Sequence, residues 1–384
     1  MSEIDYVQRA RELQDLVRAH ADANERQRHL AAPLAEAFSQ AGLYRIAAPE
    51  DCFGSAQPPR VQMEVIEAIA YADGSSAWNV MIGIESFGLI APAFGSNLEL
   101  LEDPHAIIAS STAAVGRAEE VEGGYRIDGQ WQFASGVHNA SIFGATVRVW
   151  RDGQEASSQN RYALLPLGEF EILDTWHTSG MRGSGSHDVV VRDRFVPEER
   201  LIAPIGGSGH ASPLLNFPLG ARLAYNKVAV AWGLARAGLD AFIALAEGKT
   251  PRFSSRSLRD RPRAHRAIAE AEVRLRSGKA LVYELLDDMW EAVQNRAHIS
   301  SRERALFQIA CSDSVAGCID AVNRVCRAAG TTANQNDHPL ERIRRDIAVV
   351  GQHTTVAEHH IEDGGRLLLG LPAQEMMLAG LPRT

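Results

Sequence analysis

Residues 123–136, GGYRIDGQWQFASG, decide what kind of fold this chain can form. Tyr125, Ile127, Trp131 and Phe133 alternate with polar residues, and the paired glycines and the Asp-Gly dipeptide are turn signals, a pattern typical of β-strands. Three further short runs are rich in Val and aromatic residues: FGATVRVW (143–150), RYALLPL (161–167) and SHDVVVRDRFVP (186–197). We therefore expect a small β domain, a barrel or a sandwich, over residues 105–213.

Helical patterns flank this β segment on both sides. Residues 1–104 contain one helical region that ends near Gly42 and a second from about Pro59 to Ile90, broken at 73–76. In residues 214–384, apolar residues recur at helical spacing, which predicts about four long helices in a bundle. The glycine-rich stretch 206–209 is expected to be the loop before this bundle. The fold class is therefore α+β with three domains: 1–104, 105–213 and 214–384.

Composition excludes several classes of protein. The 384 residues are 45% hydrophobic, which allows a large core, and the formal net charge of -9 disfavours nucleic acid and anionic lipid. The first residues lack a signal-peptide pattern, and no apolar stretch is judged long and charge-free enough to span a bilayer, so we expect a cytoplasmic protein that contacts no membrane. Four cysteines without a CxxC pair (Cys52, Cys311, Cys318 and Cys326) are expected to be reduced core thiols.

Five segments together resemble the acyl-CoA dehydrogenase superfamily. They occur in the order of that superfamily and span nearly the whole chain: GLYRIAAPEDCFGS (42–55), YADGSSAW (71–78), GQWQFASG (129–136), SGMRGSGSHDVVV (179–191) and ERIRRDIAVVGQHTT (341–355). The resemblance implies an N-terminal helical domain, a central β domain and a C-terminal four-helix bundle.

Within the superfamily the chain most resembles the group D flavin monooxygenases, such as dibenzothiophene monooxygenase and the oxygenase component of 4-hydroxyphenylacetate 3-hydroxylase. Aligning Arg345-Asp346 with the Arg-Asp pair of the dehydrogenases puts Thr354 where those enzymes carry a catalytic Glu, and His353 beside it. A His at that point and a Ser-Gly pair, here Ser135-Gly136, are features of the group D enzymes.

The chain departs from that group at two places. Some members carry a further His near the segment GIESF (83–87), where this chain has Glu85 and Ser86. Many have a His at the position of Asn139, whereas this chain keeps His138 beside it. Both departures bear on the substrate.

The resemblance implies a reaction, cofactors and partners. Reduced flavin, FMNH2 or FADH2, would react with O2 to form a C4a-hydroperoxyflavin, which would hydroxylate an aromatic or heteroaromatic small molecule such as a phenol or an indole. The chain has no P-loop, and GMRGSGSHD (180–188) lacks the third glycine of a dinucleotide-binding loop. A separate NAD(P)H:flavin reductase is therefore expected, and the family implies a homotetramer.

Candidate site residues follow from the same resemblance. Ser135 can donate a hydrogen bond to the flavin or its peroxide, and His353 can stabilise the peroxide or take a proton from a phenol or an indole. The full set of candidate flavin-binding residues is Trp131, Phe133, Ala134, Ser135, Ser184, Ser186, Arg252, Thr331 and Thr332, and the candidate substrate-binding residues are Glu85 and His138. Arg252 would reach the flavin phosphates of a neighbouring subunit.

Structural alternatives exist for these candidates. Ser135-Gly136 could be only a strand-ending turn, Arg252 could lie in a solvated charged loop, and Thr331 and Thr332 could only cap a helix. The cluster Glu358, His359, His360, Glu362 and Asp363 has no HExxH spacing and is expected to be mainly a solvated face, so we expect no metal.

Two other functions compete with oxygenation. A dehydrogenase or oxidase on the same fold would need a carboxylate base, for which Glu85 is the nearest candidate. A helical scaffold that has lost its flavin would be a non-catalytic protein.

Overall fold

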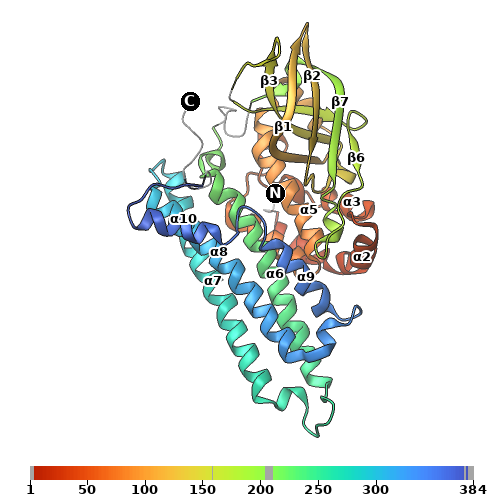
Figure 1. Cartoon of the computed structure of the whole chain (residues 1–384), viewed down its shortest axis with the longest axis vertical. Helices are drawn as coiled ribbons and strands as arrows, with labels where there is room; N and C mark the ends of the chain where they lie inside the picture. Colours follow the sequence, from red (N-terminus) through yellow and green to blue (C-terminus); the bar gives the residue numbers. More distant parts are fainter. Residues whose placement is uncertain (1–3, 158, 204–210, 376–377, 379–384) are drawn as a thin grey trace. The chain divides into compact units, whose positions relative to one another are not determined.

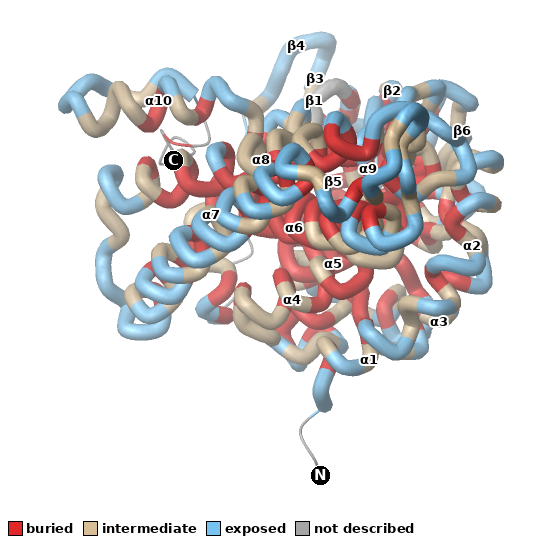
Figure 2. The backbone as a smooth tube through the Cα atoms, turned by 90° about the horizontal axis from the view of Figure 1, so that it is seen from below, coloured by how far each residue is buried: buried red, intermediate tan, exposed pale blue. Residues whose placement is uncertain are grey.

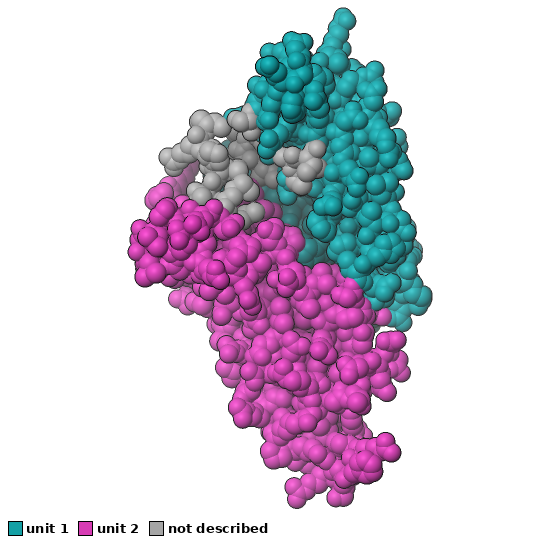
Figure 3. Space-filling model, viewed as in Figure 1, with its two compact units in different colours: residues 1–58, 78–178, 182–216 teal, residues 59–77, 179–181, 217–384 magenta. Residues whose placement is uncertain are grey.

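The computed structural model describes residues 4–157, 159–203, 211–375 and 378. They form two compact units (Figure 3): the described residues within 1–58, 78–178 and 182–216 make the first, and those within 59–77, 179–181 and 217–384 make the second. Helices and one mixed sheet are both present, so the expected α+β class is confirmed. The division into three domains stays a prediction, and the expected loop at 206–209 lies outside the described residues.

Short helices open the first unit where the sequence predicts a helical region. They are α1 (Tyr6–Glu12), α2 (Gln14–Gln27) and α3 (Ala32–Gln40). Asp5 caps α1 by accepting a hydrogen bond from the backbone N–H of Gln8 at 2.8 Å, and α2 ends at Arg28 in the left-handed conformation. The helical region ends at Gly42, where φ is +73°, as its sequence predicts.

The first unit also contains the sheet, which is open (Figure 1). Its strands are β1 (Ile108–Val121), β2 (Gly124–Trp131), β3 (Ile142–Arg151), β4 (Gln154–Glu155), β5 (Arg161–Pro166), β6 (Glu171–Leu173), β7 (Asp188–Pro197) and β8 (Leu201–Ile202). The order is β6-β7-β2-β1-β3-β5-β8 with β4 paired to β3, and only β1 and β3 are parallel among the described strands. The short strands β6 and β8 end the sheet on its two sides, so the β domain is not a closed barrel.

The segment that predicts the β domain ends β2 at Trp131. The Trp131 side chain is fully buried in the sheet core, and its indole N–H donates to the carbonyl of Thr146 at 2.8 Å. Phe133 has a φ of +58° and is 65% exposed. Strict alternation along the strand would put both rings on one face of the sheet, but the left-handed conformation of Phe133 ends the alternation after Trp131.

The second unit is a helical bundle. Its helices are α4 (Pro59–Ala70), α6 (Leu219–Gly248), α7 (Pro262–Gln294), α8 (Ser301–Ala329), α9 (Pro339–Val350) and α10 (His359–Leu368). Proline occupies the first turn of α7 and of α9, and a capping box of Ser300 and Glu303 begins α8. Helix α5 (Gly74–Ile90) starts at the predicted break, where the Asp73 carboxylate accepts from the Ser76 N–H at 2.7 Å; its residues from Trp78 onward belong to the first unit.

Helices α6 and α8 are the core helices of the bundle. Both are long and apolar enough to cross a membrane by length and composition, which differs from the sequence-based expectation. Most of each apolar window is nevertheless buried inside the molecule, and Figure 2 shows α6 buried along much of its length. Packing in the bundle thus accounts for their apolar character.

Candidate active site

Ser135 lies in a chain of three serine hydroxyls in the first unit. The Oγ atoms of Ser135 and Ser186 are 2.6 Å apart, and those of Ser186 and Ser184 are 2.7 Å apart. The indole N–H of Trp78, on α5, donates to Ser135 Oγ at 3.1 Å. All four side chains are buried, with exposed fractions between 1% and 8%. The structure therefore joins three of the candidate flavin-binding serines, whose contact with a flavin stays a prediction, and it adds Trp78, which the sequence analysis did not single out.

The backbone holds this chain in place. Ala134 N–H donates to the carbonyl of His187 at 2.9 Å, and Gly136 N–H donates to the carbonyl of Ser184 at 3.1 Å. Gly136 has a φ of +77°, and Gly185, which lies between Ser184 and Ser186 in the sequence, has a φ of +62°. Two left-handed glycines thus allow the turns 134–137 and 184–187 to lie side by side.

Exposed aromatic surface lies beside Ser135. Phe133 projects from the turn that carries Ser135 and packs edge-to-face with Trp176, at a centroid distance of 6.2 Å. Trp131 stays in the core and takes part in holding the strand, so we do not retain it as a direct ligand of the flavin. An exposed apolar ring close in the chain to a hydroxyl donor is the combination that a flavin ring can use.

His138 belongs to a group of three imidazoles. Its ring stacks on His29 at 4.3 Å with an interplanar angle of 8°, and it lies edge-on to His187 at 4.9 Å. Partial burial, together with the neighbouring imidazoles of His29 and His187, which disfavour a second positive charge, lowers the pKa of His138 to about 4. His138 is therefore neutral near pH 7, and its role toward the substrate stays a prediction.

His187 fixes the loop that carries Trp176, and the sequence did not single it out. Backbone N–H groups of Thr175 and Trp176 both donate to His187 Nδ1 at 3.2 Å. The hydrogen therefore lies on Nε2, which donates to the carbonyl of Arg28 at 3.1 Å. Burial lowers the pKa of His187, in keeping with a neutral ring that accepts two hydrogen bonds.

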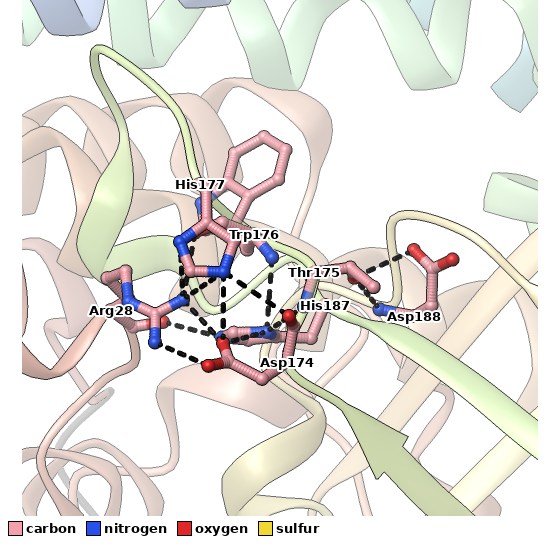
Figure 4. Close-up of polar contacts among 7 residues, drawn as sticks. All are labelled: Arg28, Asp174, Thr175, Trp176, His177, His187 and Asp188. Atoms are coloured by element: carbon pink, nitrogen blue, oxygen red, sulfur yellow. Dashed lines mark hydrogen bonds and ion pairs between the residues drawn. The ribbon is translucent and has the colours of Figure 1, made fainter.

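An ion pair between Arg28 and Asp174 holds the same loop, residues 174–177 (Figure 4). The Arg28 guanidinium binds both carboxylate oxygens of Asp174, at 2.5 and 2.9 Å, and Figure 4 shows His177 and His187 next to this pair. The Thr175 hydroxyl donates to Asp188 at 3.0 Å. The loop is therefore attached to α2 on one side and to β7 on the other.

His353 lies in the second unit, after the end of α9. The backbone N–H of Thr355 donates to His353 Nδ1 at 3.3 Å, and the Thr355 hydroxyl lies 2.9 Å from the same atom. A backbone N–H can only donate, so Nδ1 accepts and the neutral ring carries its hydrogen on Nε2. Burial, together with the positive charge of Lys227, lowers the pKa of His353 to about 3.

Helix α6 carries buried polar residues and contacts the segment that holds His353: the Thr355 hydroxyl donates to the carbonyl of Leu223 at 3.4 Å, and the Lys227 charge acts on His353. Arg222, Asn226 and Lys227 are each no more than 2% exposed, and Tyr225 donates its hydroxyl hydrogen to Gln62 at 3.0 Å. A buried cation on a core helix destabilises the fold unless other groups pair with its charge or accept its hydrogen bonds. The sequence analysis did not single these residues out, because they stand within a largely apolar stretch of the chain.

Arg252, Thr331 and Thr332 lie at one end of the bundle. Thr332 Oγ1 and the carbonyl of Ala329 accept hydrogen bonds from Lys249 Nζ, at 2.5 and 2.6 Å. Arg252 lies in the exposed loop between α6 and α7, with its guanidinium 4.9 Å from the ring centre of Phe253, which is 96% exposed. Lys249 is a further cation at this end that the sequence did not single out.

The remaining candidates have local partners or stay open. Glu85 is buried on α5, and its role stays a prediction. His360 Nε2 is 2.6 Å from the carbonyl of Thr354, and the Asp363 carboxylate accepts from the N–H groups of Gln374 and Glu375. These two members of the acidic and histidine-rich cluster thus form hydrogen bonds with the nearby backbone. Ser135 and His353 belong to different units, so their use by one flavin also stays a prediction.

Comparison with known proteins adds independent information. Residues 226–358 match a family model described as the C-terminal domain of acyl-CoA dehydrogenase. The chain is 30% identical over 354 residues to an indole-3-acetate monooxygenase of Pseudomonas putida, covering 92% of this chain and 90% of that protein. A second indole-3-acetate monooxygenase, from Acinetobacter baumannii, is 27% identical and covers 92% and 91% of the two chains. The crystal structure of 3-HSA hydroxylase from Rhodococcus sp. RHA1 is similar with a TM-score of 0.87 and 25% identity, over 98% of this chain and 100% of that chain.

Proposed function

Because this chain belongs to the flavin-dependent monooxygenases with the acyl-CoA dehydrogenase fold, we propose that it hydroxylates a small aromatic or heteroaromatic molecule, with an indole or a phenol as the preferred ring. It is an oxidoreductase that uses reduced flavin and O2. The observation that carries the substrate proposal is the similarity over 92% of the chain to two proteins named indole-3-acetate monooxygenase. Indole-3-acetate is therefore the first compound to test.

The donor set of the chain fits a flavin. When bound, reduced flavin supplies two electrons to O2, so that one oxygen atom enters the substrate and the other leaves as water. Phe133, Ala134 and Ser135 would hold its ring, because they offer an apolar face beside a hydroxyl donor. Arg252 and the hydroxyls of Thr331 and Thr332 would hold its phosphate, because they lie at one end of the bundle, where Lys249 also binds Thr332.

His353 would act as a hydrogen-bond donor. Its low pKa keeps the imidazole neutral near pH 7, and its hydrogen lies on Nε2. A ring with such a pKa is a poor base, so of the two roles predicted from the sequence we favour hydrogen bonding over proton abstraction. The structural reason is the nearby Lys227 charge together with burial.

Two partners complete the proposal. A separate NAD(P)H:flavin reductase would supply reduced flavin, because the sequence has no dinucleotide-binding loop. Four copies of the chain would form a homotetramer, in which the exposed loop that carries Arg252 would approach the flavin of a neighbouring copy. A cytoplasmic location also stays a prediction.

The test uses isotopically labelled oxygen. The protein is mixed anaerobically with FMNH2 or FADH2 and indole-3-acetate or a set of simple phenols, and then with labelled O2. We expect a product that carries one labelled oxygen atom. A dehydrogenated product without label, or release of all oxygen as hydrogen peroxide with every ring compound, would overturn the proposed function.

A further inference from the structure

The hydrogen-bonding capacity of Ser135 is almost fully used inside the protein. A serine hydroxyl has one hydrogen to donate and two lone pairs that accept. The Trp78 indole N–H is a donor only, so it occupies one lone pair of Ser135 Oγ. The second contact of Ser135 Oγ is Ser186 Oγ, at 2.6 Å, where either hydroxyl can be the donor. The direction of that contact decides what Ser135 can offer to a ligand.

The burial of Ser184, at the far end of the hydroxyl chain, indicates which way the hydrogen bonds of that chain point. Among the described residues, the only hydrogen-bond partner of Ser184 Oγ is Ser186 Oγ. If Ser135 donated to Ser186, and Ser186 to Ser184, the hydrogen of Ser184 would be left without an acceptor in a side chain that is 1% exposed. If instead Ser184 donates to Ser186, and Ser186 to Ser135, the open hydrogen belongs to Ser135, which is 5% exposed. An acceptor on a ligand at Ser135 then satisfies the whole chain, whereas no ligand atom can reach Ser184.

We propose that Trp78 and Ser186 fill both lone pairs of Ser135 and so make its hydroxyl an obligate hydrogen-bond donor toward the bound flavin. Ser186 and Trp78 are positioning residues, because they act through Ser135 and do not touch the ligand. The ligand atom that Ser135 binds must carry a lone pair. Ser184 and Ser186, predicted from the sequence to approach the flavin, instead orient the residue that does. This inference rests on the proposed function in that Ser135 contacts the flavin.

The first test uses the protein without flavin. The indole N–H resonance of Trp78 is assigned by its loss in Trp78→Phe, with tryptophan labelled with nitrogen-15. In Ser135→Ala the indole loses its acceptor, so we expect the proton resonance to move upfield and its exchange with water to become faster. In Ser186→Ala we expect a smaller change of the same resonance. An unchanged resonance in both variants would overturn the proposed contacts.

The second test is a double-mutant cycle on the affinity for FMNH2, titrated anaerobically without substrate. Ser186→Ala should weaken binding about threefold to tenfold in the wild-type background, the size expected for one hydrogen bond, and should have no further effect in the Ser135→Ala background. Ser110→Ala is the matched control, because Ser110 Oγ forms a hydroxyl pair with Ser86 Oγ at 3.1 Å elsewhere in the same unit.

The cycle separates this inference from the proposed function. Equal losses of affinity in both backgrounds, or none in the wild-type background, would overturn the positioning role of Ser186. Wild-type affinity in Ser135→Ala would overturn it as well, since Ser135 would then not reach the flavin. Neither result depends on product formation, so the labelled-oxygen experiment decides the proposed function separately.

Discussion

His353 is the residue for which the structure most changes the role expected from the sequence. A free histidine is a base near neutral pH, but burial and Lys227 keep this one neutral. Because its Nδ1 accepts from the backbone, its Nε2–H is the group that can donate. We expect His353→Gln to bind FMNH2 within about twofold of wild type, because the residue would act on oxygen transfer and not on flavin affinity. Product formed per flavin oxidised should fall several-fold, with hydrogen peroxide released instead. His359→Gln, an exposed neighbour, is the control, and unchanged coupling in His353→Gln would remove His353 from the reaction.

The same residue should make folding sensitive to acid. Its pKa is about 3 in the folded chain, while the unfolded value is about 6.5. The unfolded chain therefore binds a proton below about pH 6.5 that the folded chain rejects, so stability is full above that pH and falls as the pH decreases toward 3. We expect wild type to lose about 1 kcal/mol per pH unit more than His353→Gln between about pH 6 and pH 4, measured by urea unfolding. Parallel pH profiles of the two proteins would contradict this.

At the scale of residues, the sequence indicated which residues belong to the candidate site, but it did not predict which other residues they contact. It selected Ser135, Ser184 and Ser186, because a family pattern marks them, and the structure joins their hydroxyls. It could not find the direction of the hydroxyl chain or the indole of Trp78, since both depend on residues about fifty positions apart. It also placed Phe133 with Trp131, because alternation cannot reveal one residue with positive φ.

Helix packing gives a sharp prediction at the scale of elements. A Cβ atom on Gly233, in α6, would lie 2.5 Å from both the Cβ of Ala70 and the carbonyl oxygen of Glu67, in α4. Backbone cannot move away as a flexible side chain can, so Gly233→Ala should lower the free energy of unfolding by about 1–3 kcal/mol. Gly248→Ala in the same helix, where a Cβ would meet nothing within 4 Å, is the control. Equal unfolding midpoints for the two variants would show that the α4 and α6 contact tolerates a methyl group.

Elements bounded by local signals were easier to predict than long-range pairings. Proline at the start of α7 and α9, and Asp73 before α5, mark helix ends within a few residues. The parallel pairing of β1 with β3, and the short end strands β6 and β8, have no local signal. The sequence therefore predicted a β domain but not that its sheet is open.

At the scale of the whole molecule, the dependence of the chain on a separate flavin reductase can be tested directly. The chain alone should not oxidise NADH, because no dinucleotide-binding loop is present in its sequence. Any flavin reductase that releases FMNH2 or FADH2 should restore product formation, even when a dialysis membrane separates the two proteins. NADH consumption by the purified chain would contradict the proposal, and a requirement for physical contact would show that the partners form a complex.

The proposal that copies of the chain share their flavin sites leads to a complementation test. If Arg252 of one copy binds the flavin phosphate of the next, a complete site needs Ser135 from one chain and Arg252 from another. Arg252→Ala and Ser135→Ala should each weaken FMNH2 binding, and light scattering should show the same assembly for both, since neither change removes a core side chain. When the two variants are unfolded and refolded together in equal amounts, random assembly should recover about a quarter of the tight sites. A mixture that binds no better than its components would place Arg252 and Ser135 at the flavin of a single chain, or remove Arg252 from the site. Lys249→Ala, tested in the same way, should behave like Arg252→Ala because Lys249 lies at the same end of the bundle and binds Thr332.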